Sequence, residues 1–466
     1  MSDFLLQWES PQLDYYWCHH LIHEVYAKNL VKARLGDQER DWIASCDASG
    51  FSFHISQGEI QRLAPVARAF YTDRTRLENY FRDIEILSRH VDTLPWHPAP
   101  GEDPLDALDR IEPLFHEAIG LHLCSQPHLT QVVEQELTLA LDAIGMQGDE
   151  RHQAMDWLLR PRRLPLVLQE RLDWYEQVLC VPPDHTDQRL IDHLDTWRYL
   201  TAGDSKQPTT EAELRARLTA DRRCLDQTAE QARRLREIAD GDLPPVPTAL
   251  HSAGAALDWA ERARGLAYYR FMTKQTWLKL WYLMEQHREV LGPEAAGLIT
   301  QEARETSGED HDRSAYVLLS TDGFVELFYN GTDTAVRGHH LTPLEPLGDR
   351  PLTGSTGYPG LVEGTVVVID WSDSLETKRH LVGEETILVV PQTTPDFVPL
   401  LNQCTGLVAD EGGLTGHASI IAREMRLPTL IGSRVGTRLL RDGDRIVLNA
   451  SEGWVRRTPP HSMEAV

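Results

Sequence analysis

The period of the hydrophobic pattern changes at about residue 314, and this change most constrains how the chain can fold. From Met1 to about Thr300, apolar residues recur mostly at the three- and four-residue intervals that are typical of amphipathic helices. After about Ser314, short β-branched runs such as Thr365–Ile369 alternate with turn residues. A chain of 466 residues is long enough for about two to four domains. We therefore predict a multidomain protein with a large, mainly α-helical N-terminal region and a C-terminal α/β domain.

The helix signals of the N-terminal region are clearest between Thr210 and Gly241. Thr210-Glu-Ala-Glu213 has the sequence of a capping box, in which the Thr hydroxyl and the Glu carboxylate bind amide groups at a helix start. Leucines then recur at nearly helical spacing until Gly241, where a glycine favours a helix end. Further helices are expected over about 12–34, 56–90, 104–124, 128–145, 165–180, 188–200 and 255–290.

Turn residues mark the boundary between the two regions. The runs Ala315–Ser320 and Phe324–Tyr329 are separated by Thr-Asp-Gly, which predicts a small β-hairpin. Glycine and proline are frequent from Pro343 through Gly360, and this composition is typical of a hinge. The expected organisation is a helical domain over 1–313, a hairpin region over 314–342, a linker over 343–360, an α/β domain over 361–457 and a tail over 458–466.

The composition restricts the partners and the location of the protein. The net charge is −25, from 71 acidic and 46 basic residues, so the surface repels phosphate backbones and anionic lipid, and neither nucleic acid nor a membrane is expected as a partner. The first residues lack the basic and apolar stretches of an export signal. The six cysteines are scattered without a Cys-x-x-Cys pair, as expected for reduced thiols of a cytoplasmic protein.

The segment Gly406–Gly432 has the pattern of a functional site. It predicts a buried strand, a double-glycine turn and a helix whose first turn holds His417. Gly412 and Gly413 allow backbone amides to approach an anion closely, and the helix start offers further N–H groups. Gly416 lies at the same helix start and completes the expected phosphate-binding set.

His417 is the candidate nucleophile of this segment. The positive end of the helix dipole disfavours the imidazolium form, so the ring is expected to stay neutral. Thr415 offers a hydroxyl nearby, and Arg423 is expected to reach back along the helix to a phosphoryl oxygen. A neutral imidazole among anion-binding groups can attack a phosphate and carry it on nitrogen. His417, Thr415 and Arg423 are therefore the candidate catalytic residues, and the alternative is a structural histidine in a tight turn.

Segment 352–457 resembles the mobile phosphohistidine, or swivelling, domain of phosphoenolpyruvate-utilising enzymes such as phosphoenolpyruvate synthase, pyruvate phosphate dikinase and rifampin phosphotransferase. The family signature has two glycines, a variable residue, a threonine, a small hydroxyl or thiol residue and the carrier histidine. Two positions depart from it, since Gly416 replaces Ser, Cys or Thr and Ser419 replaces Ala. Val390–Asp396 is a supporting match. The positions that agree with the signature are Gly412, Gly413, Thr415, His417, Ala418, Ala422, Arg423, Pro428 and Gly432.

The resemblance implies a phosphotransferase component that carries a phosphoryl group on His417. Complete members of the family also have an ATP-grasp domain and a barrel domain, and neither is recognised in this sequence. ATP and Mg²⁺ are therefore expected to be bound mainly by an ATP-grasp partner protein or subunit, and a small-molecule acceptor by the helical domain 1–313. Two alternatives stay open. One is an ATP-driven ligase or dehydratase in which the phosphoryl group only activates the substrate, and the other is a non-enzymatic phosphohistidine relay subunit.

The helix over 255–290 is the candidate acceptor-binding element. Its aromatic residues could line a pocket while an arginine meets the incoming phosphoryl group. Aromatic residues at helical spacing more often belong to the core, and this interpretation is favoured. The candidate substrate-binding residues are Arg262, Arg264, Arg270, Trp277 and Trp281.

Two weaker clusters have structural interpretations as well. His19 and His23 lie one helical turn apart and could ligate a metal ion, but no acidic third ligand is evident. With His20 they are expected to form an exposed polar helix face, and no metal site is predicted. Asp410 and Glu411 precede the glycine turn, where they could contact Mg²⁺ during phosphorylation or form a solvated turn.

Overall fold

The structure is a computed structural model that describes most of the chain. The chain divides into two compact units. The N-terminal unit comprises Met1–Val132, Leu194–Thr210 and Tyr268–Pro343, and the C-terminal unit comprises Val133–His193, Glu211–Ala267 and Leu344–Val466. The described residues are 4–10, 15–47, 50–95, 99–180, 186–201, 209–222, 225–241, 245–291, 316–321, 323–329, 350–370, 373, 375–393, 397–413 and 416–458. The predicted tail, apart from Thr458, lies outside them.

The two units differ from the domain ranges expected from the sequence. Residues 133–193 and 211–267 were expected in the helical domain 1–313, but they cluster with the C-terminal residues. Their helices pack against the α/β domain, as described below. Among the described residues, no helix is both long enough and apolar enough for a membrane span.

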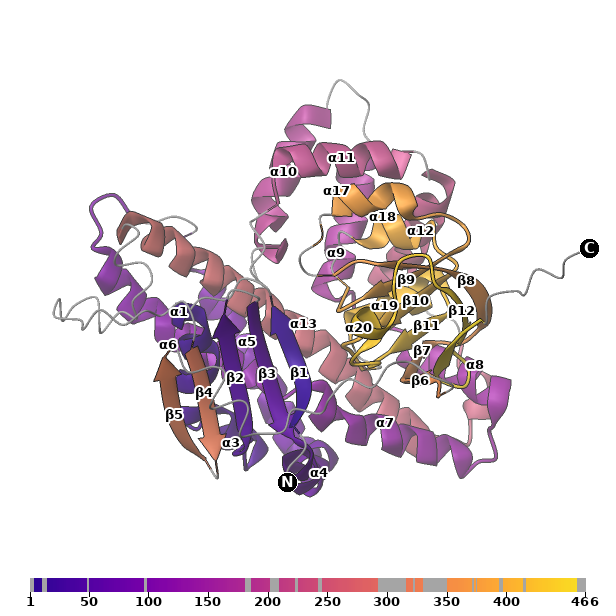
Figure 1. Cartoon of the computed structure of the whole chain (residues 1–466), viewed down its shortest axis with the longest axis horizontal. Helices are drawn as coiled ribbons and strands as arrows, with labels where there is room; N and C mark the ends of the chain where they lie inside the picture. Colours follow the sequence, from indigo (N-terminus) through magenta and orange to yellow (C-terminus); the bar gives the residue numbers. More distant parts are fainter. Residues whose placement is uncertain are drawn as a thin grey trace, which may run out of the picture. The chain divides into compact units, whose positions relative to one another are not determined.

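The N-terminal unit contains a five-stranded antiparallel sheet (Figure 1). The predicted hairpin is present as β4 and β5, but β4 also pairs with β2, so the hairpin forms one edge of this sheet rather than a separate region. In spatial order, the strands are β1 (Phe4–Ser10), β3 (Gly50–Ser56), β2 (Trp42–Asp47), β4 (Tyr316–Thr321) and β5 (Phe324–Tyr329).

Strands β1 to β3 were not predicted, because the N-terminal region was interpreted as helical. In β3, buried Phe51, Phe53 and Ile55 alternate with polar residues, which is the period of two of a strand. The run is short, and the sheet that it belongs to is completed by β4 and β5, which lie far along the sequence. The prediction therefore followed the helical patterns on either side of the run. The region is nevertheless mainly helical, as expected.

Helices pack around this sheet within the N-terminal unit. The helix predicted over 56–90 is two helices, because Asp73 has an extended backbone and its carboxylate accepts a hydrogen bond from the Arg76 amide (3.1 Å) to begin the second. The helical elements are α1 (Tyr15–Cys18), the π-helix η1 (His19–His23), α2 (Glu24–Ala27), α3 (Leu30–Leu35), α4 (Gln57–Thr72), α5 (Arg74–Asp92), α6 (Pro104–Leu123) and parts of α7 (Pro127–Asp142), α10 (Thr186–Trp197) and α13 (Gly254–Leu291).

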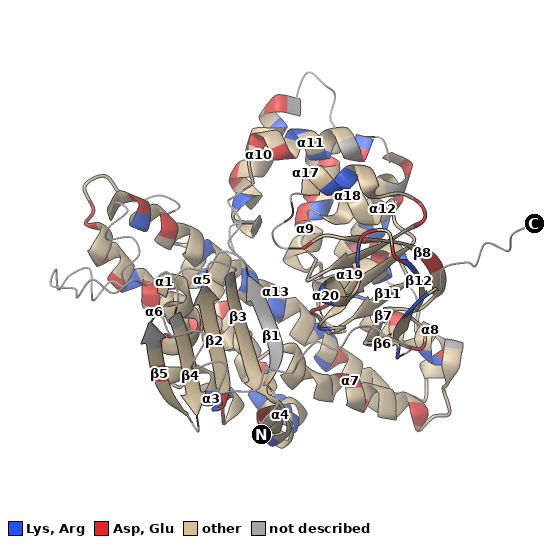
Figure 2. Ribbon diagram, in the orientation of Figure 1, with Lys and Arg blue, Asp and Glu red and all other residues tan. Residues whose placement is uncertain are grey.

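An eight-stranded sheet forms the centre of the C-terminal unit. Strands β8 to β11 run parallel, and β12 and β7 flank them in the antiparallel direction. Strands β9, β10 and β11 are completely buried and contain no charged residue, whereas the helices of the unit carry many (Figure 2). In spatial order the strands are β6 (Leu352–Thr353), β13 (Trp454–Arg457), β12 (Arg445–Asn449), β8 (Leu361–Val368), β9 (Thr386–Val390), β10 (Gly406–Ala409), β11 (Thr429–Ile431) and β7 (Ser355–Tyr358).

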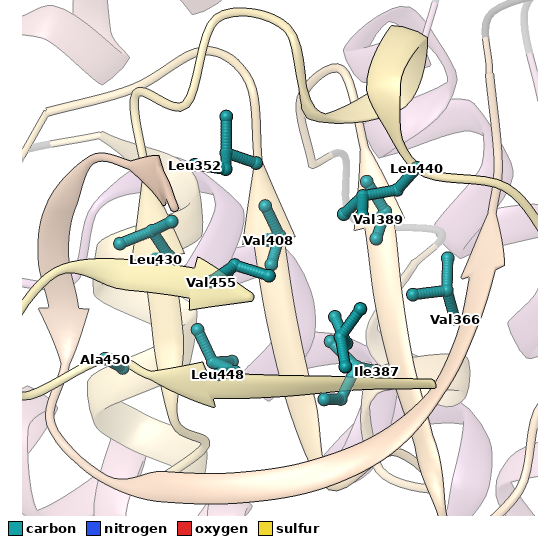
Figure 3. Close-up of a cluster of buried hydrophobic side chains, with 11 residues drawn as sticks. Leu352, Val366, Ile387, Val389, Val408, Leu430, Leu440, Leu448, Ala450 and Val455 are labelled. Carbon is teal, nitrogen blue, oxygen red and sulfur yellow. The ribbon is translucent and has the colours of Figure 1, made fainter. Parts of the chain in front are cut away.

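Aliphatic side chains from these strands, together with Leu440 after α20 and Ala450 after β12, form one hydrophobic core (Figure 3). Val408 of β10 lies among residues of the neighbouring strands and is fully buried. At about 25 cal/mol per Å² of apolar surface, burial of such side chains supplies the main favourable contribution to the folding of this domain. The core residues are Leu352, Val366, Ile387, Val389, Val408, Leu430, Leu440, Ile446, Leu448, Ala450 and Val455.

Helices from the middle of the chain pack against this α/β domain. Arg234 of α12 donates to the Glu424 carbonyl (2.9 Å) at the end of α19, and Gln231 donates to Asn402 (2.6 Å) after α18. The elements of this unit include α8 (Gly148–Leu159), α9 (Leu166–Asp173), the π-helix η2 (Trp174–Leu179), α11 (Glu211–Asp221), α12 (Leu225–Asp240), α17 (Leu375–Lys378), α18 (Val398–Leu401), α19 (His417–Met425) and α20 (Gly436–Leu439).

The predicted linker is partly a piece of the sheet. Residues 343–349 lie outside the described residues, but 352–358 form strands β6 and β7. The glycines that suggested a hinge allow close backbone packing instead. A Cβ atom on Gly354 would lie 2.5 Å from the Ile431 carbonyl oxygen, and one on Gly360 would lie 2.5 Å from Pro428 Cγ.

Substitution of Gly354 distinguishes a sheet position from a hinge. Gly354→Ala is expected to destabilise the C-terminal unit by about 1–3 kcal/mol, because the new methyl group meets backbone that cannot move aside. Gly383→Ala is the control, since a Cβ there has no atom within 4 Å. Denaturant unfolding of the full chain measures both variants. Equal midpoints for Gly354→Ala and the parent would show that this segment is not held in the sheet.

A buried ionic network joins helices α9, α10 and α11. Arg217 donates to Glu170 (2.6 Å), and His193 Nε2 lies 3.0 Å from the same oxygen. Arg171 donates to Asp221 (3.0 Å). Opposite charges are paired throughout this network, which offsets much of the free energy lost when the groups leave water.

The network makes stability depend on pH through His193. Burial lowers the pKa of His193, but the hydrogen bonds with Asp173 and Glu170 raise it by a larger amount. The net pKa is therefore higher than the usual value of 6.5. The protonated ring therefore stabilises the fold below about pH 6.5, and this contribution is lost as the pH rises through the raised pKa.

We expect the unfolding midpoint to fall as the pH rises through this window. The dependence should be smaller in His193→Gln, where the titrating group is absent, and unchanged in His380→Gln, which alters an exposed histidine of the same unit. Identical pH profiles for the parent and His193→Gln would contradict a stabilising imidazolium.

Candidate functional site

The candidate site lies at the carboxyl ends of the parallel strands β9, β10 and β11. These ends meet at one edge of the sheet, which is where open α/β sheets commonly bind ligands. We call it the histidine edge and define it as residues 391–393, 410–413, 416–417 and 432–437. The edge brings together three loops and the first turn of α19.

His417 is the first residue of α19, and a tight glycine turn leads into it. The Gly416 amide donates to the Gly413 carbonyl (2.9 Å), which also accepts the Ser419 hydroxyl (2.9 Å). Gly416 is the N-cap residue and has no side chain to bind the first amides of the helix. Gly416 therefore leaves the first amides of α19 without a cap from its own side chain, and amides of this kind can bind an anion.

The backbone explains why glycines occupy this turn. Gly412 has a φ of +128°, in the region that favours glycine. A Cβ atom on Gly416 would lie 3.1 Å from the Gly413 carbonyl oxygen, which is closer than nine in ten real Cβ contacts. Gly412, Gly413 and Gly416 thus lie together at the start of α19. That they bind phosphate stays a prediction.

Thr393 contacts His417 and was not predicted as a site residue. Its hydroxyl, which is buried, lies 2.7 Å from His417 Nδ1. The hydrogen bond orients the imidazole and assigns its two nitrogens different roles. Thr393 belongs to the Val390–Asp396 match, so this segment was the signal for it in the sequence.

Thr415 and Arg423 are the other two candidate catalytic residues. Thr415 lies outside the described residues. Arg423 is buried, and its pKa is lowered to about 10 because burial disfavours the charged form more than Asp156 and Glu424 favour it. Six residues of helix correspond to about 9 Å and about 240°, so Arg423 and His417 leave α19 on different sides. The contact of Arg423 with a phosphoryl oxygen stays a prediction.

Asp410 has a structural role that neither sequence interpretation anticipated. It is buried, and its carboxylate accepts hydrogen bonds from Ser433 Oγ (2.6 Å), the Gly436 amide, the Thr437 amide (3.0 Å) and Thr437 Oγ1 (2.6 Å). Asp410 therefore ties the end of β10 to the start of α20. These bonds occupy both carboxylate oxygens, which disfavours Asp410 as a ligand of Mg²⁺ and excludes a solvated side chain.

The candidate acceptor-binding residues of α13 fall in both units. Arg262 pairs with Asp258 (2.8 Å) and Arg264 with Glu261 (2.5 Å) in the C-terminal unit. In the N-terminal unit, Arg270 donates to the Ser125 carbonyl. Trp277 and Trp281 are both buried there, and Trp281 stacks on Trp17 at a centroid distance of 3.9 Å. The structure therefore does not place these five residues in one described site.

Comparisons with known proteins concern the same part of the chain. Residues 382–453 match the family described as PEP-utilising enzyme, mobile domain. A probable phosphoenolpyruvate synthase from Archaeoglobus fulgidus is 39% identical over 104 residues, which are 22% of this chain and 13% of that protein. A phosphoenolpyruvate synthase from Aeropyrum pernix is 34% identical over 110 residues, which are 24% of this chain and 13% of that protein. An uncharacterized phosphotransferase, YvkC, from Bacillus subtilis is 36% identical over 102 residues, which are 22% of this chain and 12% of that protein.

The matched region is the one that carries the glycine turn and His417. This chain spans only 12–13% of the length of these relatives. The family match covers residues 382–453, and each of these relatives matches less than a quarter of this chain, so the comparisons do not describe the rest of it. Within the matched segment, the likeness confirms the family predicted from the sequence. Residues 382–453 of the C-terminal α/β domain are therefore similar in sequence to the mobile domain of PEP-utilising enzymes.

Proposed function

We propose that the chain is a phosphotransferase component that carries a phosphoryl group on His417. The observation that supports this most strongly is the position of His417. It begins α19 next to the Gly412–Gly413 turn, and Thr393 holds its ring. The names of the relatives, phosphoenolpyruvate synthase and phosphotransferase, describe phosphoryl-transfer enzymes and support the same reaction class.

Nε2 is the proposed attacking atom, because Nδ1 is engaged with Thr393. In the tautomer in which Nδ1–H donates to Thr393 Oγ1, the Nε2 lone pair attacks phosphorus. The Nε2–P bond forms while the bond from phosphorus to the donor oxygen breaks, and the leaving oxygen takes that electron pair. The imidazole becomes cationic and keeps its Nδ1 proton, which Thr393 stabilises. When the phosphoryl group leaves, the ring returns to its neutral form.

Backbone amides at the helix start would neutralise the charge of the phosphoryl oxygens. The Gly412–Gly413 turn lies next to the first turn of α19, so amides of both would bind the same phosphoryl group. Such positioning and charge stabilisation supply most of the rate enhancement in phosphoryl transfer. No side chain besides His417 has to change its covalent bonds in this scheme.

The proposal also assigns the phosphoryl donor and the phosphoryl acceptor. ATP and Mg²⁺ would be bound by an ATP-grasp protein or subunit, and a small-molecule acceptor by the helical part of this chain. We also propose a cytoplasmic location, because the six cysteines are scattered along the sequence without a Cys-x-x-Cys pair. If the product retains phosphate, the reaction is a kinase reaction. A condensed product with free phosphate would favour the ligase or dehydratase, and phosphorylation without any acceptor would favour the relay.

The carrier residue can be tested without the partner by using potassium phosphoramidate, which phosphorylates histidine directly. We expect acid-labile phosphate to accumulate selectively on His417, because the glycine turn binds the phosphoryl oxygens. His417→Ala should lose this phosphate, while His380→Ala, at an exposed histidine of the same unit, should retain it. Mass spectrometry locates the group, and circular dichroism checks the fold. Equal incorporation into His417→Ala and the parent would refute the assignment.

The role of Thr393 predicts a graded series. Thr393→Val keeps the shape but removes the hydroxyl, so the rate of His417 phosphorylation should fall about fivefold to tenfold, as expected from a loss of about 1 kcal/mol. Thr393→Ser keeps the hydroxyl and should stay within about twofold to threefold of the parent. If the Val and Ser variants react at the same rate, the hydrogen bond does not contribute to the reaction.

A further inference from the structure

A π-helical turn in the N-terminal unit brings two histidines and a glutamate together. In η1 the Glu24 amide donates to the His19 carbonyl, which is the five-residue hydrogen bond of a π-helix. Residues 19, 23 and 24 therefore share one side of the turn, whereas residues 19 and 24 diverge in an α-helix. We call His19, His23 and Glu24 the His–Glu cluster. Single π-turns within helices occur frequently at functional sites.

The donor atoms of the His–Glu cluster have the spacing of metal ligands. Glu24 Oε1 lies 3.1 Å from His19 Nε2 and 3.5 Å from His23 Nδ1, and all three atoms lie within 4.8 Å of one another. A tetrahedral ion with bonds of about 2.1 Å separates its ligands by about 3.4 Å. Two of the three separations, 3.1 Å and 3.5 Å, are close to this value, and the third is at most 4.8 Å.

The cluster is reachable from solvent. The side chains of His19, Glu24 and His23 are 11%, 21% and 33% exposed, so the cluster lies below the surface with His23 on its open side. His23 Nδ1 is itself buried and has no hydrogen-bond partner among the described residues. A cation bound here would give that nitrogen a partner, which supports a ligand at this position.

Lys28 contacts the carboxylate of the cluster and is itself in contact with His116. Lys28 Nζ donates to Glu24 Oε2 (2.7 Å), which leaves Oε1 directed at the two histidines. The same ammonium group lies 3.2 Å from His116 Nδ1, and His116 Nε2 lies 2.7 Å from His20 Nδ1. Because Lys28 can only donate, His116 accepts at Nδ1 and donates from Nε2 to His20. Outer contacts of this kind fix ligand orientation in metal sites.

These positions correct the expectation of an exposed polar helix face. His19 and His20 are buried, and the acidic group that seemed to be missing is Glu24. The sequence interpretation used α-helical spacing, in which a residue five positions after His19 lies off its face. The π-turn changes the spacing and so supplies the carboxylate.

We propose that His19 Nε2, His23 Nδ1 and Glu24 Oε1 form a binding site for a divalent transition-metal ion, with Zn²⁺ as the best match to the donors. Two imidazoles and one carboxylate are a known ligand set for zinc sites that keep a coordination position open. The fourth position would be occupied by water or by a ligand from solvent. The site is independent of His417, since it is built only from residues of the N-terminal unit.

Cobalt is the probe for this site, because Zn²⁺ has no visible spectrum. The full chain is freed of metal with a chelator and titrated with Co²⁺ while visible absorption is recorded. We expect one equivalent to bind with the intense d–d bands of a four- or five-coordinate ion, and Zn²⁺ to displace it. Elemental analysis of the protein before chelation provides a second, independent readout.

Matched variants separate this site from other histidines. His23→Ala and Glu24→Gln should each weaken Co²⁺ binding at least tenfold to 100-fold and abolish the d–d bands. His90→Ala, at an exposed histidine of α5 in the same unit, should bind like the parent. Circular dichroism identifies any variant that fails to fold, and Glu24→Asp, which keeps the charge, should bind more strongly than Glu24→Gln. Parent protein without the d–d bands, or with bands that persist in folded His23→Ala, would overturn the proposal.

Discussion

The hydrogen bond between Thr393 and His417 is the contact on which the proposed chemistry depends. It joins the loop after β9 to the first residue of α19, 24 positions further along the chain. The two residues meet because β9 and β10 are parallel neighbours that end at the same edge, with Val390 beside Ala409. Asp410 holds that edge in place through four hydrogen bonds, one from Ser433 after β11 and three from Gly436 and Thr437 at the start of α20. The buried strands thus position a nucleophile whose own helix begins without a side-chain cap. A change in strand register would move every group of the site together.

The C-terminal unit is larger than the mobile domain alone. Arg234 and Gln231 of α12 bind the α/β domain next to α19 and α18, and β6 and β7 incorporate much of the segment that resembled a hinge. Movement of the α/β domain by itself would break these hydrogen bonds. If His417 travels between a donor and an acceptor, helices such as α12 are therefore expected to travel with it. This differs from a simple swivel about residues 343–360, in which every helix before residue 313 would stay behind.

The parts of the structure that were predictable from the sequence are those encoded locally. The glycine turn, His417 and α19 lie within the 14 residues from Gly412 to Met425, and the buried strands of the C-terminal domain are short β-branched runs, so both were recognised. Thr393 was missed as a contact because strand pairing, not sequence distance, brings it to His417. Strands β1 to β3 were missed because their sheet is completed by β4 and β5. Gly354 was assigned to a hinge because glycine is favoured both in flexible segments and where backbones pack closely. Glu24 was missed as a neighbour of His19 because a π-turn alters helical spacing.

The most direct test of the central claim is to determine which nitrogen of His417 carries the phosphoryl group. Protein labelled with ¹⁵N in its histidines and phosphorylated with phosphoramidate gives long-range ¹H–¹⁵N spectra in which the two ring nitrogens are distinct. The account predicts phosphorus on Nε2, with Nδ1 still hydrogen-bonded to Thr393. Phosphorus on Nδ1 would require that hydrogen bond to break first. That result would contradict the proposed role of Thr393 and the orientation of the ring at the start of α19.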